Sequence, residues 1–185
     1  MLTMISAVIA TLNDEAGLSA TLAALTGPAV DGFVREVIVA DAGSTDATLA
    51  IADEAGARMV RAKGAAALGE GCAAARQPWL LLLKAGTRPQ AGWEQAAWRH
   101  INDHNDQAGW FRLSLKAGGL QARAAELRAA LEARLFGRLR AEHGLLISRR
   151  LLEESLEKRS GSAPMSLPLR LSPRALQLMK ARILA

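Results

Sequence analysis

The sequence predicts an α/β protein in which a mostly parallel central sheet is flanked by helices. From residue 5 to residue 83, apolar segments of strand length alternate with segments whose apolar residues recur at helical spacing. This alternation is typical of parallel strands joined by crossover helices. The chain has 185 residues and half of them are hydrophobic, which is enough to bury the core of one domain. The four leucines of Leu80–Leu83 suit a strand buried on both faces.

The first half of the chain contains four predicted strands and three predicted helices. The strands cover residues 5–11, 34–40, 57–61 and 79–83, and the helices lie between them, the third at residues 65–75. Asn13 is predicted to cap the first helix, which should stop at Gly27 and Pro28. Ser44 or Thr45 is predicted to cap the second helix.

The second half departs from this regular alternation. The predicted elements are a helix at 90–105, a strand at 110–115, a long helix at 120–140, a strand at 145–148, a helix at 149–158, mostly loop at 160–173 and a final helix at 175–184. The final helix is predicted because Leu176, Met179 and Ile183 would share one face. No internal repeat and no separate second domain is evident.

Charge and cysteine content restrict the partners and the compartment. The net charge is +5, and from Arg112 to Arg150 nine basic residues stand against three acidic ones. Such an excess indicates an anionic neighbour, although an arginine-rich, solvated helix face explains it equally well. The single cysteine, Cys72, has no partner for an internal disulfide, so we expect a packed side chain in a reducing cytoplasm. No apolar run approaches the ~18 residues of a membrane span, and the first residues are interpreted as a strand, not a signal peptide.

Three segments carry more specific information than periodicity. They read AVIATLNDE at residues 7–15, EVIVADAGSTDAT at residues 36–48 and LLLLKAGTRPQAGW at residues 80–93. In this order they resemble family 2 glycosyltransferases, which have the GT-A fold and read roughly S-V-I-I-P-T-x-N-E, I-I-V-V-D-D/G-G-S-T-D-x-T and L-L-F-L-D/H-A-D-T-x-x-x-x-G-W. Later segments are similar to a bacterial subgroup of that family. The resemblance covers most of residues 5–155.

The resemblance implies a nucleotide site around Asp41. In the family, the counterpart of Asp41 accepts the imide N–H of uracil or thymine, and the loop containing Thr11 and Asp14 lies beside the base. Asp41 also stands where a strand ends and a tight turn at Gly43 begins, so it could instead only organise that turn. For Asp46 and Asn13 we favour capping over direct contact with a ligand.

The segment after the fourth strand departs from the family pattern. Relatives supply a carboxylate there that binds Mg²⁺ or Mn²⁺, which bridges the diphosphate of the sugar nucleotide. Here the matching triplet is Lys84-Ala85-Gly86, in which Gly86 has no ligand atom and the lysine ammonium repels a cation. We therefore predict no metal at residues 84–86 and no metal cofactor, with Lys84 near the diphosphate.

The residues that would activate the acceptor are also altered. The subgroup has Gly-Asp-Gln where this chain has Ala141-Glu142-His143, and its catalytic Glu-Asp motif is matched only by Met165-Ser166-Leu167. Glu142 and His143 are weak candidates for a replacement base and could equally be ordinary loop residues. His100 and His104 have metal-ligand spacing, but a solvated surface explains them better; Trp93, Trp98 and Trp110 are predicted to be core residues.

These observations predict one GT-A-like domain over residues 1–185. It would comprise a nucleotide-binding half at 1–90, an acceptor-side half at 91–160, and a C-terminal loop and helix at 161–185. By resemblance the function is hexosyl-type transfer from a nucleotide-diphosphate sugar to an unknown acceptor. The alternatives are a catalytically inactive relative that binds a nucleotide or a partner protein, and a metal-independent transferase. We expect a cytoplasmic protein and no nucleic-acid partner, and the basic excess is compatible with peripheral contact at an anionic inner membrane surface.

Overall fold

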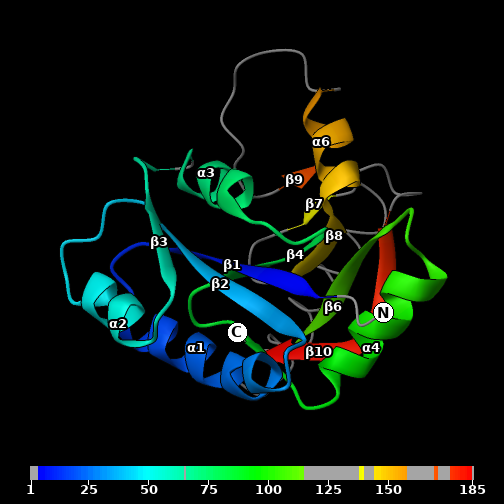
Figure 1. Cartoon of the computed structure of the whole chain (residues 1–185), viewed down its shortest axis with the longest axis horizontal. Coiled ribbons are helices and arrows are strands. Elements are labelled where there is room, and N and C mark those ends of the chain that lie inside the picture. Colours follow the sequence, from blue (N-terminus) through cyan, green and yellow to red (C-terminus); the bar gives the residue numbers. More distant parts are fainter. Residues whose placement is uncertain are drawn as a thin grey trace, which may run out of the picture.

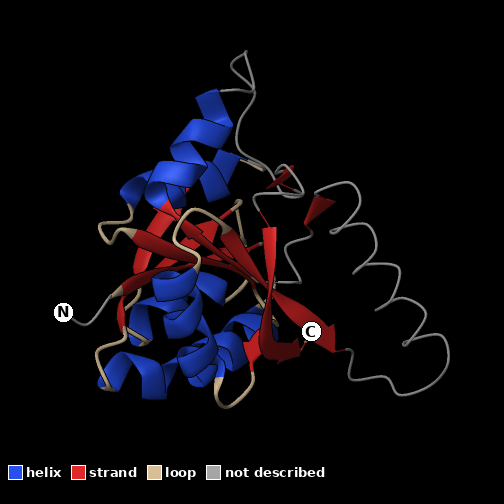
Figure 2. Ribbon diagram, turned by 90° about the vertical axis from the view of Figure 1, so that its right-hand side faces the viewer, coloured by secondary structure: helices blue, strands red, loops and turns tan. Residues whose placement is uncertain are grey.

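The computed structural model describes residues 4–64, 66–114, 138–139, 144–157, 169–170 and 176–184. In this part of the chain, an eight-stranded mixed sheet lies between two layers of helices (Figures 1 and 2). The strands of this sheet are β1 (Ile5–Thr11), β2 (Val34–Asp41), β3 (Arg58–Arg61), β4 (Trp79–Lys84), β5 (Arg88–Pro89), β6 (Ala108–Ser114), β8 (Leu145–Ser148) and β10 (Leu176–Leu184). The helices are α1 (Glu15–Val30), α2 (Thr48–Glu54), α3 (Ala66–Ala74), α4 (Trp93–Asp103) and α6 (Arg149–Glu157). Two short strands, β7 (Arg138–Leu139) and β9 (Leu169–Arg170), pair with each other.

The first four strands are parallel neighbours, which confirms the predicted α/β sheet. The strand order is β3-β2-β1-β4-β8-β6-β10-β5, with β8 antiparallel to β4 and β6, and β5 antiparallel to β10. Thr11 is the register partner of Asp41, and Ala10 is the register partner of Lys84. The carboxyl ends of β2, β1 and β4 are therefore level at one edge of the sheet.

The core has two layers, one on each face of the sheet. Helices α1, α2 and α4 cover the face that carries Leu81 and Leu83, and α3 and α6 cover the face that carries Leu80 and Leu82 (Figure 1). All four leucines are at most 1% exposed, as expected for a strand covered on both sides. Cys72 packs in the second layer, where burial raises the pKa of its thiol to about 12.

Helix α3 packs closely against the sheet because it carries Gly71. A Cβ atom on Gly71 would lie 2.9 Å from both Ala40 Cβ and Val8 Cγ1. Two of the three tryptophans predicted to be core residues, Trp93 and Trp110, are buried, whereas Trp98 is 48% exposed on α4. The prediction for Trp98 was therefore wrong.

The boundaries of α1 differ from the prediction at both ends. Asp14, not Asn13, caps the helix, and the helix continues through Gly27 and Pro28 to Val30. Pro28 is buried on the same side of α1 as Leu18, Thr21 and Leu25, so packing of that side outweighs the backbone hydrogen bond lost at proline. Residues 44 and 45 do not cap α2: it begins at Thr48, whose N–H donates to Asp46 Oδ1 at 3.1 Å.

The last segment is a strand and not the helix expected at 175–184. Residues 176–184 form β10, which pairs in parallel with β6 and antiparallel with β5. Three apolar residues at helical spacing are a weak local signal, and pairing on both sides of the strand outweighs it. Residues 138–139 are likewise a strand within the predicted 120–140 helix, and the rest of that helix lies outside the described residues. No helix of the described part is long and apolar enough to cross a membrane.

Candidate functional site

Three of the predicted site residues end neighbouring strands at one edge of the sheet. Asp41 ends β2, Thr11 ends β1 and Lys84 ends β4. Adjacent strands lie about 4.8 Å apart, so Asp41 and Lys84 are separated by roughly 10 Å across β1. The alternation along each strand directs Thr11 and Asp41 toward the α1 and α2 face and Lys84 toward the α3 face. A ligand lying across this edge would therefore meet side chains from both faces.

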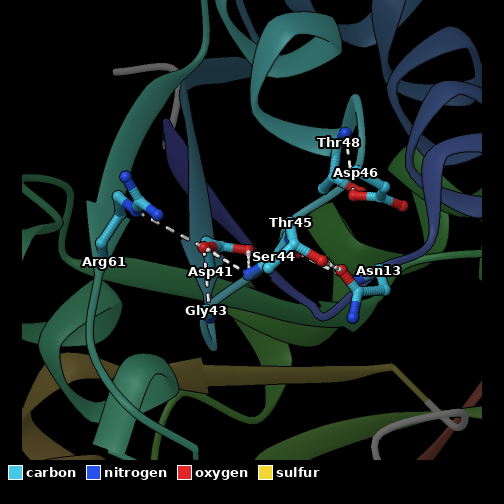
Figure 3. Close-up of polar contacts among 8 residues, drawn as sticks. All are labelled: Asn13, Asp41, Gly43, Ser44, Thr45, Asp46, Thr48 and Arg61. Atoms are coloured by element: carbon cyan, nitrogen blue, oxygen red, sulfur yellow. Dashed lines mark hydrogen bonds and ion pairs between the residues drawn. The ribbon is translucent and has the colours of Figure 1, made fainter.

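The Asp41 carboxylate is buried and holds the turn that follows β2. Its oxygens accept hydrogen bonds from the N–H groups of Gly43 and Ser44 at 3.1 Å (Figure 3). Arg61 Nε lies 3.7 Å from Asp41 Oδ2, and the Asp41 residue is 0% exposed. Gly43 has a φ of 113°, which a residue with a side chain rarely adopts. These contacts show that Asp41 organises the turn. A carboxylate has about four lone-pair positions, so Asp41 retains the capacity to accept one further hydrogen bond.

Two loops are joined to each other beside this turn. The Asn13 N–H donates to Ser44 Oγ at 2.8 Å, and Asn13 Oδ1 accepts from the Thr45 N–H at 2.8 Å. Glu15 Oε1 accepts from the Ala47 N–H at 2.8 Å. Asn13 has a φ of 47°, a left-handed conformation that asparagine tolerates. Asn13 is thus a bridge between loops, and the contribution of Glu15 was not predicted because its partner is 32 residues away.

Asp14 connects the start of α1 to the turn after β4. Its Oδ1 accepts from the Gly17 N–H at 2.9 Å, and its own N–H donates to Thr48 Oγ1 at 3.2 Å. Asp14 Oδ2 also lies 3.9 Å from the position that a Cβ on Gly86 would occupy. Asp14 therefore joins the start of α1 to the start of α2 and lies close to the Gly86 turn. Thr11 Oγ1 is buried and has no hydrogen-bond partner among the described residues.

Lys84 begins a tight turn between β4 and β5. The Thr87 N–H donates to the Lys84 carbonyl oxygen at 3.0 Å, and Gly86, the third residue of the turn, has a φ of 89°. This geometry belongs to a turn that needs glycine at its third position. The Thr87 carbonyl oxygen accepts from Thr21 Oγ1 at 2.9 Å, which anchors the turn to α1. Lys84 itself is exposed.

The donor atoms of this turn do not fit Mg²⁺ or Mn²⁺. Both ions prefer oxygen ligands, and the side chains of residues 84–86 supply none. Within the described ranges, no group of three or more His, Cys, Asp or Glu residues could hold a metal ion. Glu142, His143 and residues 165–167 lie outside the described residues, so their assignments stay predictions.

His100 is buried, which contradicts the expected solvated position. It is 3% exposed, and its Nε2 lies 3.0 Å from the Gln107 carbonyl oxygen. Its Nδ1 has no hydrogen-bond partner in the described part of the chain. Burial lowers the pKa of His100, and the contact with the Gln107 carbonyl opposes that shift only in part. The His100 and His104 rings lie 5.7 Å apart between centroids, but His100 is a core residue of α4 and not a surface ligand.

Comparisons with known proteins show which family and which solved structures this chain is similar to. Residues 6–142 match the family described as glycosyl transferase family 2. Among solved structures, the chain is similar to glucosyl-3-phosphoglycerate synthase from Mycobacterium tuberculosis in complex with phosphoglyceric acid, with 25% identity, a TM-score of 0.66, and coverage of 95% of this chain and 69% of that one. No curated protein matches the sequence.

Two further structures of that synthase contain a divalent cation. The complex with Mn²⁺, UDP-glucose and phosphoglyceric acid has 26% identity and a TM-score of 0.55, and covers 80% of this chain and 57% of that one. The complex with Mg²⁺ and UDP has 25% identity and a TM-score of 0.58, with the same coverage of 80% and 57%. The chain therefore spans between 57% and 69% of the length of these synthase chains.

Proposed function

Because the chain belongs to glycosyl transferase family 2 and has the GT-A fold, we propose that it binds a nucleotide-diphosphate sugar and transfers the sugar to an acceptor. The observation that carries this proposal is the convergence of Thr11, Asp41 and Lys84 at the carboxyl ends of three parallel strands. Ligands of open α/β sheets bind outside such strand ends. Two of the synthase structures similar to this chain contain UDP or UDP-glucose, which supports a uridine nucleotide as the donor.

The base end of the site would lie over β1 and β2. Thr11 and Asp41 are register partners, and both are buried. Uracil presents one N–H donor between two carbonyl acceptors. The remaining lone pair of Asp41 suits the N–H, and the Thr11 hydroxyl suits a carbonyl oxygen. Asp14 and the loops joined by Asn13 would form the wall beside the base.

A nucleotide-binding protein without transferase activity is the second candidate function. Gly86 favours this second candidate, because the family resemblance leads one to expect a carboxylate at that position. The φ of 89° at Gly86 suits glycine and not a residue with a carboxylate side chain. The base end and the diphosphate end are separate parts of the site. Binding could therefore persist where transfer does not.

Calorimetric titration with uridine, UDP and a panel of UDP-, GDP- and dTDP-sugars tests the proposal. We expect binding of the uridine compounds, and about tenfold weaker uridine binding in Thr11→Val, which removes one buried hydroxyl without changing the volume greatly. Thr26→Val is a matched control, because the Thr26 hydroxyl is exposed on α1 and bonds to the Leu22 carbonyl oxygen. A folded wild-type protein that binds no nucleotide would overturn the proposal. UDP binding without release of UDP from UDP-sugars would favour the second candidate.

A further inference from the structure

The turn after β4 points to a way of binding a diphosphate that needs no divalent cation at residues 84–86. We propose that the ammonium group of Lys84 neutralises the diphosphate, in place of a divalent cation held by the Lys84–Thr87 turn. The inference rests on the proposed function, since it assumes that a nucleotide diphosphate lies across this edge. It goes further by naming the cation that the site uses.

The carboxylates near the turn are already engaged by the protein. Asp14 Oδ1 accepts the Gly17 N–H at 2.9 Å and so caps α1. The oxygens of Asp41 accept the N–H groups of Gly43 and Ser44. Hard divalent cations require several oxygen ligands, and both of these carboxylates already accept hydrogen bonds from backbone N–H groups.

The backbone of the turn also disfavours a metal ligand at position 86. Gly86 has a φ of 89°, so any residue with a side chain would be strained there. A Cβ at this position would point toward Asp14, with Asp14 Oδ2 only 3.9 Å away. The turn is therefore built for glycine, and an aspartate in its place would be strained before it could bind a metal ion.

Lys84 lies where a diphosphate would be expected if the base is held at Asp41. It is the last residue of β4, it is exposed, and the Ala85 N–H bonds to the Ala10 carbonyl oxygen at 2.9 Å, which keeps the strand end fixed against β1. The distance of roughly 10 Å from Asp41 is compatible with the extent of a nucleotide from base to phosphates. A lysine ammonium binds phosphate oxygens as a point charge and needs no fixed coordination geometry.

Parallel titrations with UDP and uridine test this inference. In EDTA, we expect wild-type protein to bind UDP more tightly than uridine. Lys84→Ala should weaken UDP binding about ten- to a hundredfold and leave uridine binding unchanged. Lys84→Arg should retain most of the preference for UDP. Lys63→Ala is the matched control, since Lys63 is another exposed lysine, in the loop after β3 at the same edge, and should not change the ratio of the two affinities. Thermal unfolding of each variant checks that the fold is kept.

The outcomes separate this inference from the proposed function. Wild-type protein that binds neither UDP nor uridine would overturn the proposed function and the inference with it. Uridine binding without Mn²⁺, together with UDP binding that requires Mn²⁺, would overturn the inference alone. Equal effects of Lys84→Ala on both ligands, or no effect on either, would also overturn it.

Gly86→Asp provides an independent test of the metal question. We expect no Mn²⁺-dependent gain in UDP affinity, and no Mn²⁺ binding in the electron paramagnetic resonance spectrum of the Mn²⁺-titrated variant. Gly86→Ala is the matched control for backbone strain at this φ. A Mn²⁺-dependent rise in UDP affinity in Gly86→Asp, but not in Gly86→Ala, would show that the turn accepts a metal ligand and would contradict the inference.

Discussion

The side-chain oxygen of Asn13 accepts a hydrogen bond from the backbone N–H of Thr45 at 2.8 Å, joining the loops that follow β1 and β2 (Figure 3). Asn13→Ala removes this bond and places alanine at a φ of 47°, so we expect a loss of about 1–2 kcal/mol in the free energy of unfolding. Asn13→Gly loses only the bond and should cost about 0.5 kcal/mol. Urea denaturation measures both values, and equal effects of the two variants would contradict the strain argument.

Gly17 and Asp14 compete for the same space at the start of α1. A methyl group on Gly17 would lie 2.3 Å from Asp14 Oδ2, so Gly17→Ala should force the carboxylate away and remove a helix cap worth about 1 kcal/mol. In an Asp14→Ala background the same substitution should stabilise the protein by up to about 1 kcal/mol, because alanine favours helix. Thermal unfolding of the four proteins gives the double-mutant cycle. An effect of Gly17→Ala that is the same in both backgrounds would contradict this account.

Gly71 allows α3 to approach the sheet, and its substitution should be costly. Gly71→Ala places a methyl group 2.9 Å from Ala40 Cβ and Val8 Cγ1, and such overpacking costs about 1–3 kcal/mol. Gly27→Ala is the matched control in α1, where no atom lies within 4 Å of the added Cβ. We expect a change below about 0.5 kcal/mol there, because the gain in helix propensity is offset by the restriction that Pro28 places on the preceding residue. Chemical denaturation of both variants measures the contrast.

His100 should make stability depend on pH below the ordinary histidine range. Burial lowers its pKa in the folded protein, so the unfolded chain takes up a proton first, at a pKa of about 6.5. Stability should therefore be complete above about pH 6.5 and fall as the pH decreases below it. His104 and Asp106 act on His100 in opposite directions and only modify this effect.

The measurement is the free energy of unfolding between about pH 7 and pH 5, where carboxylates remain mostly ionised. We expect His100→Gln to reduce the slope, because glutamine does not titrate and can still donate to the Gln107 carbonyl oxygen. His104→Gln, which keeps His100, should retain the slope. A slope that disappears in His104→Gln and persists in His100→Gln would show that the wrong histidine has been identified.

The parallel half of the fold could be predicted from the sequence because its signals are local. The strand ending at Asp41 and the leucines of β4 are continuous apolar runs, and each crossover helix follows its strand directly. Strand β10 could not be predicted in this way, since its pairing with β6 depends on residues about 70 positions earlier in the chain. Local spacing gave Leu176, Met179 and Ile183 a helical pattern that this long-range pairing outweighs.

In the candidate site, too, features set by neighbouring residues could be predicted, and contacts between distant segments could not. Asp41 and its turn were identified from the family resemblance of residues 36–48 and from their position after a strand, and the structure shows that turn held by Asp41 itself. The bridge from Asn13 to Thr45 and the proximity of Asp14 to Gly86 join segments 32 or more residues apart, which no spacing rule addresses. The burial of His100 likewise depends on how α4 packs in the folded protein.

The position of β10 between β6 and β5 has a consequence for synthesis on the ribosome. Strands β3, β2, β1 and β4 can form their hydrogen bonds as soon as the first half of the chain has emerged. Strand β5 finds its partner only when residues 183–184 have been made, and until then β6 has an open edge. A nascent chain would thus carry the four parallel strands β3, β2, β1 and β4 together with an unpaired edge of β6, which could pair with strands of other chains. Slow translation of residues 176–184 would lengthen the interval in which that edge stays unpaired.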